Sequence, residues 1–158
     1  MVSITPFLWF DGQVRQAVDF YASVFPDAEI ISTSVFPGDA PDRQAGDFMT
    51  ATIRIAGQEV TILDGGPSFT LDPAFSFFVS CKGQDEVDYY WDKLLEGGKA
   101  SQCGWLTDKF GLSWQIVPTR LGELLSAPDR EAADRALQAM LKMIKLDIAG
   151  LESAFNAA

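Results

Sequence analysis

The sequence predicts an α+β fold built from two βαβββ pseudo-repeat modules and C-terminal helices. Three observations lead to this prediction. The segment Val18-Asp19-Phe20-Tyr21 returns as Val87-Asp88-Tyr89-Tyr90, and strand and helix patterns follow in the same order around both segments. After Pro118 only helical periodicity remains.

The first module contains four strand patterns and one helix pattern. Its helix, over residues 14–25, carries apolar side chains on one face. The strand patterns are residues 4–10, 28–36, 48–56 and 59–63. The last two join at the short turn Ala56-Gly57-Gln58, and the polar segment 37–47 has no apolar period, which predicts a long loop.

The second module is shorter because it lacks such a loop. Strand patterns occupy residues 74–81 and the regions around 102–107 and 112–117, with a helix between the first two. One helix covers only one side of a sheet, so we expect the modules (about 1–70 and 74–118) to pair into one domain, residues 1–118, with a half-open cup between the sheets. Residues 119–158 form a helical extension, in which Met140 and Met143 fill a core or an interface, and a homodimer is expected.

Composition excludes several classes of function. The formal charge of −10 disfavours nucleic acid and anionic membranes as partners. The chain has no histidine, which removes serine–histidine–aspartate catalysis and two-histidine metal sites. The absence of a secretory pattern or a long apolar run predicts a cytoplasmic protein with no membrane partner, in which Cys81 and Cys103 are reduced, structural thiols.

Six motifs carry a family resemblance: ITPFLWFDG, AVDFYASVFPDAEI, DGGPSF, EVDYYWDKL, QCGWLTDKFGLSWQIVP and ALQAMLKMIKLDIAGLE. Together they resemble the PhnB-like branch of the vicinal oxygen chelate superfamily, often labelled 3-demethylubiquinone-9 3-methyltransferase. The resemblance implies a metal ligand on the first and last strand of a module. Gln115 stands where the last-strand glutamate is expected, and Thr61 is its counterpart, four residues after Gly57. The first-strand positions fall near Ile4 or Pro6 and near Phe75 or Phe77, none of which binds a metal through its side chain.

We therefore expect a small hydrophobic or aromatic ligand, bound without a cofactor or transition metal, and assign no catalytic residue. Strand alternation suggests a pocket lined by Leu8, Phe10, Thr61, Leu63, Asp64, Phe77, Trp105 and Gln115. One alternative is an enzyme, either a methyltransferase or one that uses Mg²⁺ or Ca²⁺ at Asp64 with Glu59 and Asp108. For methyl transfer, the sequence lacks the glycine-rich strand-to-helix turn that would hold the cofactor, since Gly65-Gly66 precedes Pro67. Another alternative is a dimeric interaction protein whose aromatic side chains fill the cup.

Overall fold

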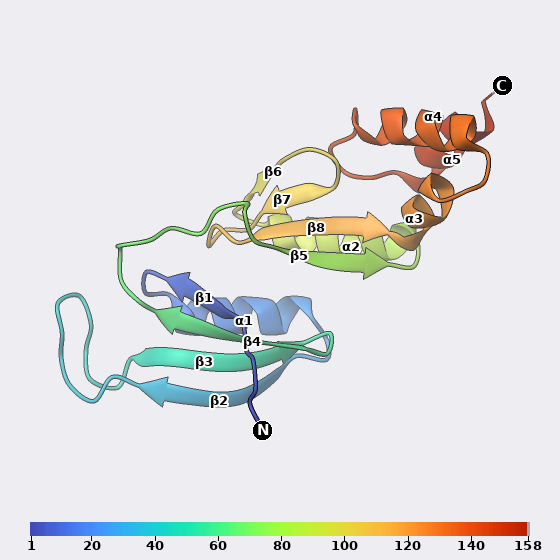
Figure 1. The fold of residues 1–158 in the computed structure, drawn as a ribbon. Coiled ribbons are helices and arrows are strands. Elements are labelled where there is room, and N and C mark those ends of the chain that lie inside the picture. Colours follow the sequence, from blue (N-terminus) through green and yellow to red (C-terminus); the bar gives the residue numbers. More distant parts are fainter. Residues whose placement is uncertain (158) are drawn as a thin grey trace. The chain divides into compact units, whose positions relative to one another are not determined.

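The computed structural model describes residues 1–157 and divides into two compact units, Met1–Leu71 and Asp72–Ala158 (Figure 1). Each unit contains one βαβββ module, and the second also contains the C-terminal helices. The predicted fold class is thus confirmed. That residues 1–118 form a single domain stays a prediction.

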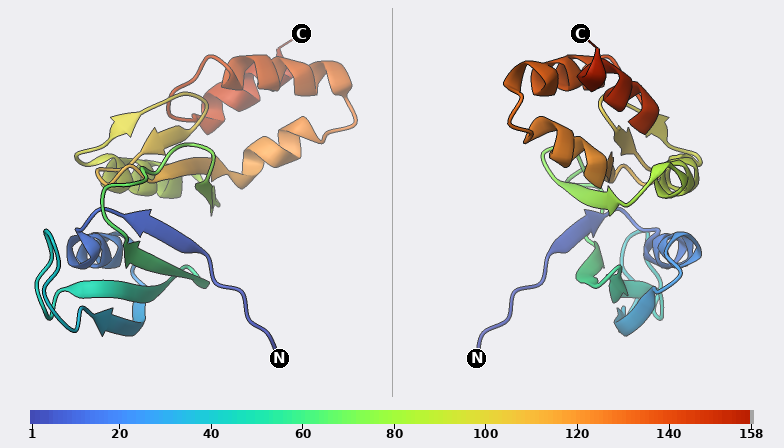
Figure 2. Two further views of the ribbon diagram at one scale, coloured as in Figure 1. Left: turned by 60° about the vertical axis from the view of Figure 1, so that its left-hand side comes forward. Right: turned by 90° about the vertical axis from the view of Figure 1, so that its right-hand side faces the viewer.

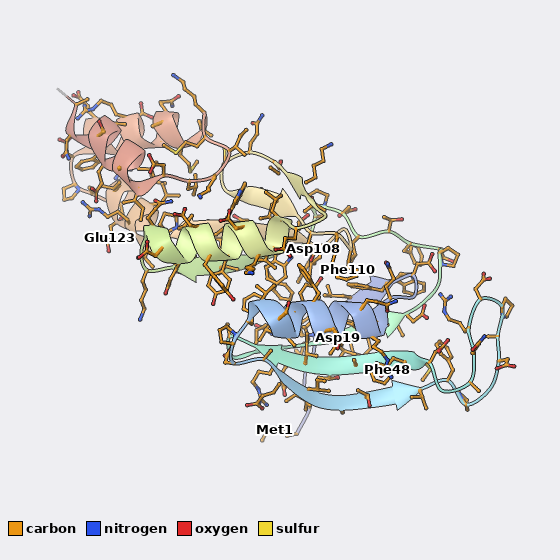
Figure 3. The ribbon with its side chains drawn as sticks, turned by 180° about the vertical axis from the view of Figure 1, so that it is seen from behind. Met1, Asp19, Phe48, Asp108, Phe110 and Glu123 are labelled. Atoms are coloured by element: carbon orange, nitrogen blue, oxygen red, sulfur yellow. The ribbon has the colours of Figure 1, made fainter. Side chains whose placement is uncertain are left out.

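Unit 1 is a four-stranded sheet with one helix across one face. Its elements are β1 (Phe7–Phe10), α1 (Val14–Val24), β2 (Glu29–Val35), β3 (Phe48–Ile55) and β4 (Gln58–Asp64). The strand order is β1-β4-β3-β2, with β1 parallel to β4 and the other pairs antiparallel. Seen from behind, α1 lies in front of these strands (Figure 3). Alternate residues of β3 (Ala51, Ile53 and Ile55) are buried on this face, as the half-covered sheet requires.

The first strand is shorter than the predicted 4–10. Ile4 is exposed, and Pro6 has no N–H to donate, although its carbonyl oxygen accepts the N–H of Thr61 at 2.9 Å. The predicted turn at Ala56-Gly57 is confirmed. Both residues have positive φ, 47° and 82°, as a two-residue hairpin turn requires.

Unit 2 repeats the module with shorter strands. Its elements are β5 (Ser76–Cys81), α2 (Gln84–Leu95), β6 (Lys99–Ala100), β7 (Trp105–Thr107) and β8 (Ser113–Pro118), in the order β5-β8-β7-β6. The pattern around 102–107 was expected to be one strand, but residues 102–104 form a tight turn and the two-residue strand β6 precedes it. Two residues are too few for alternation to reveal a strand in a sequence.

Three helices follow β8: α3 (Thr119–Leu125), α4 (Arg130–Met140) and α5 (Ile148–Asn156), drawn in orange and red in Figure 2. Asp129 and Asp147 cap α4 and α5 through side-chain bonds to backbone N–H groups. Met140 and Met143 pack against a core that includes Leu124, so they act as core filler. The predicted homodimer is not tested by these contacts. No helix among residues 1–157 has the length and apolar character needed to cross a membrane.

The two cysteines are free but differ in their surroundings. Cys81 is fully buried at the end of β5, whereas Cys103 is partly exposed in the turn before β7. Burial, aided by the nearby Glu86 carboxylate, raises the pKa of the Cys81 thiol to about 11.

Asp108 organises the turn between β7 and β8. Its side chain is only 3% exposed. Oδ1 accepts the N–H groups of Phe110 (2.9 Å) and Leu112 (3.1 Å), and Oδ2 accepts the indole N–H of Trp114 (2.9 Å). A buried carboxylate with three donors fixes both the turn and the start of β8.

Replacing Asp108 with asparagine should destabilise the protein by about 2 kcal/mol, because an amide nitrogen must face an N–H donor that the carboxylate now satisfies. Urea denaturation of D108N measures this loss. The control is D92N on the exposed side of α2, expected within about 0.5 kcal/mol of wild type. Equal stability of the two variants would contradict a structural role for Asp108.

A thiol reagent such as Ellman's reagent should label only Cys103 rapidly at pH 8. A pKa of about 11 leaves about 0.1% of Cys81 as thiolate, and burial blocks access to it. The C103S variant should lose the rapid phase. Two rapid equivalents in the folded wild type would show that Cys81 is accessible.

Candidate functional site

In unit 2, the side chains of Phe78, Gln115 and Trp105 form a row across the sheet. Gln115 of β8 is paired with Phe78 of β5 and with Trp105 of β7, and residues paired directly across strands share a face. The neighbouring row contains Leu106 and Trp114, each 1% exposed, on the face that α2 covers. The Phe78–Gln115–Trp105 row therefore lies on the face turned away from α2.

Unit 1 has the equivalent row. Thr61 of β4 is paired with Phe7 of β1 and with Thr52 of β3, on the face turned away from α1. The two phenylalanines match closely in exposure, at 60% for Phe7 and 59% for Phe78. Each module thus places an exposed phenylalanine beside a polar residue of its last strand.

The polar residues of both rows already have partners. The hydroxyl groups of Thr52 and Thr61 are hydrogen-bonded at 2.7 Å, and Gln115 Nε2 donates to Ser76 Oγ at 3.0 Å. These groups are neutral, so they suit orientation of a ligand by hydrogen bonds. Ser113, on the same face of β8 as Gln115, keeps its buried hydroxyl without a hydrogen-bond partner among the described residues.

The predicted pocket residues divide between the two faces of each sheet. Thr61 and Leu63 lie on the uncovered face of unit 1, and Gln115 and Trp105 on that of unit 2. Three predicted pocket residues lie instead on the helix-covered faces, which corrects the prediction for them: Leu8, Phe10 and Phe77.

The correction has a simple cause. A shift of one residue in strand pairing moves a side chain to the opposite face, and the sequence does not fix the parallel register of β1 on β4 or of β5 on β8. Leu8 is paired with Ile62, which is fully buried. Phe7 and Phe78 were therefore missed, although each is adjacent to a predicted first-strand position.

Asp64 stands apart from both rows, at the end of β4 on the helix side. Its Oδ1 accepts the N–H of Gly12 at 2.9 Å, and its Oδ2 forms an ion pair with Arg43, which reaches in from the loop 37–47. Arg43 also binds Asp11 at 3.0 Å. The polar loop gave no sign of this contact, because only the folded path of the chain brings Arg43 to the sheet.

The proposed carboxylate cluster for Mg²⁺ or Ca²⁺ does not assemble around Asp64. Glu59 is paired with Arg54 at 2.9 Å, and Asp108 belongs to the other unit, where three donors hold it. Within residues 1–157, no three histidine, cysteine, aspartate or glutamate side chains are grouped to hold a metal ion.

A cavity of about 510 Å³ lies in unit 1 between the start of α1 and the loop 37–47. Asp19 on α1 and Phe48 at the start of β3, both labelled in Figure 3, line it. Its walls carry both signs of charge, and the guanidinium of Arg15 covers the Phe48 ring at 4.0 Å. This cavity therefore does not suit the hydrophobic ligand expected from the sequence.

Gly65-Gly66 serves the packing of Trp9. A Cβ atom at Gly65 would overlap the indole ring, and Trp9 Nε1 donates to the Gly66 carbonyl oxygen at 2.9 Å. Phe69 meets the same indole edge-on at 5.0 Å. The glycine pair is thus occupied by the protein's own side chain and offers no cradle for the nucleotide part of a methyl donor.

Comparison with known proteins gives one family match and several similar structures. The 3-demethylubiquinone-9 3-methyltransferase family model matches residues 2–117. The PhnB protein of Bacillus cereus, named for the same methyltransferase, is 33% identical, with a TM-score of 0.66 over 74% of this chain and 99% of its own. No curated protein matches the chain.

Two more distant structures share the fold. PA1353 of Pseudomonas aeruginosa is 20% identical, with a TM-score of 0.62 over 75% of this chain and 98% of its own. The fosfomycin resistance protein FosX of Listeria monocytogenes is 18% identical, with a TM-score of 0.56 over 80% of this chain and 98% of its own.

FosX has been crystallised with Mn(II). The two rows of the present chain do not fit a transition-metal ion, because their last-strand residues are Thr61 and Gln115 and their first-strand residues are phenylalanines. The family itself is clear: from its match over residues 2–117 and its 33% identity to the Bacillus cereus protein, the chain belongs to the PhnB-like 3-demethylubiquinone-9 3-methyltransferase family of the vicinal oxygen chelate superfamily.

Proposed function

We propose that this PhnB-like protein binds a small hydrophobic or aromatic molecule, without a transition metal, on the sheet face of unit 2 that is turned away from α2. The observation that carries the proposal is the Phe78–Gln115–Trp105 row. It combines two aromatic side chains with one amide, which suits a flat ligand that also needs orientation.

Exposed aromatic surface supports a ligand over a self-filled fold. Phe78 remains 59% exposed, and Trp105 of the same row is only half-buried. Large exposed apolar side chains that gather in one region are typical of a binding surface. A self-filled site would instead bury these rings.

The donor chemistry supports binding without a transition metal. Zinc and manganese sites use imidazole, thiolate or carboxylate ligands, whereas both rows offer only neutral oxygen and amide groups. Gln115 and Thr61 are further engaged by Ser76 and Thr52. We assign no reaction, because no general acid or base stands in either row.

The Q115L variant should lose ligand-induced stabilisation. A panel of naphthols, quinones and aromatic antibiotics is screened by thermal shift, and a bound ligand at about 100 times its Kd adds about 2.7 kcal/mol to wild type. Leucine keeps the approximate size of Gln115 but removes its hydrogen bonds, so the variant should show a small shift or none.

The matched control is Q138L, which makes the same change on α4 of the same unit. It should keep the wild-type response. If Q115L unfolds without ligand, Gln115 is a structural hydrogen-bonding residue. If wild type responds to no aromatic compound, and sedimentation shows a dimer that covers the rows, the binding proposal fails in favour of an interaction protein.

Removal of metals should leave ligand binding unchanged. Protein treated with EDTA and dialysed should give the same ligand Kd, by titration calorimetry, as untreated protein. Adding Mn²⁺, Zn²⁺, Mg²⁺ or Ca²⁺ should not raise the Tm of the stripped protein. A cation-dependent rise in Tm, or loss of affinity after EDTA, would contradict a metal-free site.

A further inference from the structure

The C-terminal extension adds contacts that lie outside the matched family region. The family model ends at residue 117, and about a quarter of the chain is unmatched by the Bacillus cereus relative. The extension nevertheless touches the module of unit 2 through the segment 143–148 between α4 and α5. These contacts converge on the turn that precedes Trp105.

The turn Gln102–Trp105 has two consecutive left-handed residues. Cys103 and Gly104 have φ values of 58° and 84°, and Trp105 N–H donates to the Gln102 carbonyl oxygen at 3.0 Å. The central N–H groups of such a turn point outward and need partners. Cys103 N–H donates to Met143 O and Gly104 N–H to Ile144 O, both at 2.8 Å.

Close packing holds the turn on its other side as well. Gly104 O accepts the N–H of Ile116 in β8 at 2.7 Å. A Cβ atom at Gly104 would approach the Leu146 side chain to 3.0 Å and the Ile116 carbonyl oxygen to 2.9 Å. The turn is therefore held between β8 and the extension.

Side chains of α2 fix the segment itself. Gln84 Nε2 donates to Leu146 O at 3.1 Å, and its Oε1 accepts the N–H of Ile148 at 2.8 Å. Lys145 Nζ lies 2.5 Å from Asp88 Oδ1. These bonds tie the extension to a helix of the module, so the extension does not depend on the turn alone for its position.

We infer that the segment 143–148 is a positioning clamp for Trp105, which it holds beside Gln115. The inference rests on the proposed function for its consequence, since Trp105 is paired with Gln115 in the row that is proposed to contact the ligand. Through the clamp, residues outside the matched family region set the order of one aromatic wall of the site. Gln84 and Lys145 are thus positioning residues.

The test compares Q84A/K145A with Q138A/K142A in the full chain labelled with 5-fluorotryptophan. The control removes the same residue types from α4 and the segment that follows it, where Gln138 bonds within its own helix and Lys142 is exposed. The W105F variant assigns the Trp105 fluorine resonance. We expect Q84A/K145A to shift and broaden this resonance while that of Trp9 in unit 1 is unchanged.

The affinity of wild type for the best aromatic compound of the screen gives the second readout. If the loosened Trp105 occupies its position for about one fifth of the time, the Kd weakens about fivefold in Q84A/K145A and stays constant in the control. An unchanged Trp105 resonance, or an equal change in both double variants, overturns the clamp. If all four tryptophan resonances lose their native positions, Q84A/K145A has unfolded. The K145A variant is then measured in its place, and the same criteria apply. If wild type binds no compound, the proposed function fails while the fluorine result still decides the clamp.

Discussion

Parallel pairing between the first and last strand of each module decides what either sheet can present to a ligand. In unit 1 this pairing places Phe7 beside Thr61, and in unit 2 it places Phe78 beside Gln115. Because side chains alternate along a strand, the same register sends Leu8 and Trp114 toward the helices. Core and candidate site therefore depend on one choice: a shift of one residue would bury the site and expose the core.

The two modules fix the antiparallel register of the last strand on its hairpin partner in different ways. Unit 1 joins β3 and β4 by a two-residue turn whose positive φ values fit the twist of the hairpin. Unit 2 uses a longer turn that is closed around the buried Asp108. Asp108 also binds Trp114, the residue directly before Gln115, so the carboxylate fixes the strand residue on one face and thereby the amide on the other. Asp108 is thus a structural group, because its carboxylate is engaged by donors of the turn and of Trp114.

The sequence was sufficient to predict what short-range patterns control. The repeated segments predicted two modules, and the spacing from Gly57 and Gly111 predicted Thr61 and Gln115 as equivalent residues, which the paired strands agree with. The sequence did not determine the register of the parallel strand pairs, because no turn connects β1 to β4 directly. Alternation alone does not decide which set of side chains faces the helix. The ion pair of Arg43 with Asp64 was hidden for a related reason: it joins a loop of no periodicity to a strand end. Backbone hydrogen bonds from the turn at Cys103 to Met143 and Ile144 have no side-chain signature at all.

The amide at position 115 limits the chemistry that the proposed site can offer a ligand. A carboxylate can bind a cation but only accepts hydrogen bonds, whereas an amide is neutral, donates through nitrogen and accepts through oxygen. Gln115 spends one donor on Ser76, which holds the amide plane and leaves its oxygen as an acceptor for a ligand. With phenylalanine and tryptophan on either side, apolar contact would supply the affinity of the proposed site, and the amide would select orientation. Such a site needs its aromatic walls to be well ordered, because disorder in Trp105 reduces the fraction of molecules ready to bind. The proposed clamp at residues 143–148 would meet that need with backbone bonds to the turn, anchored by Gln84 and Asp88 on the module's own helix.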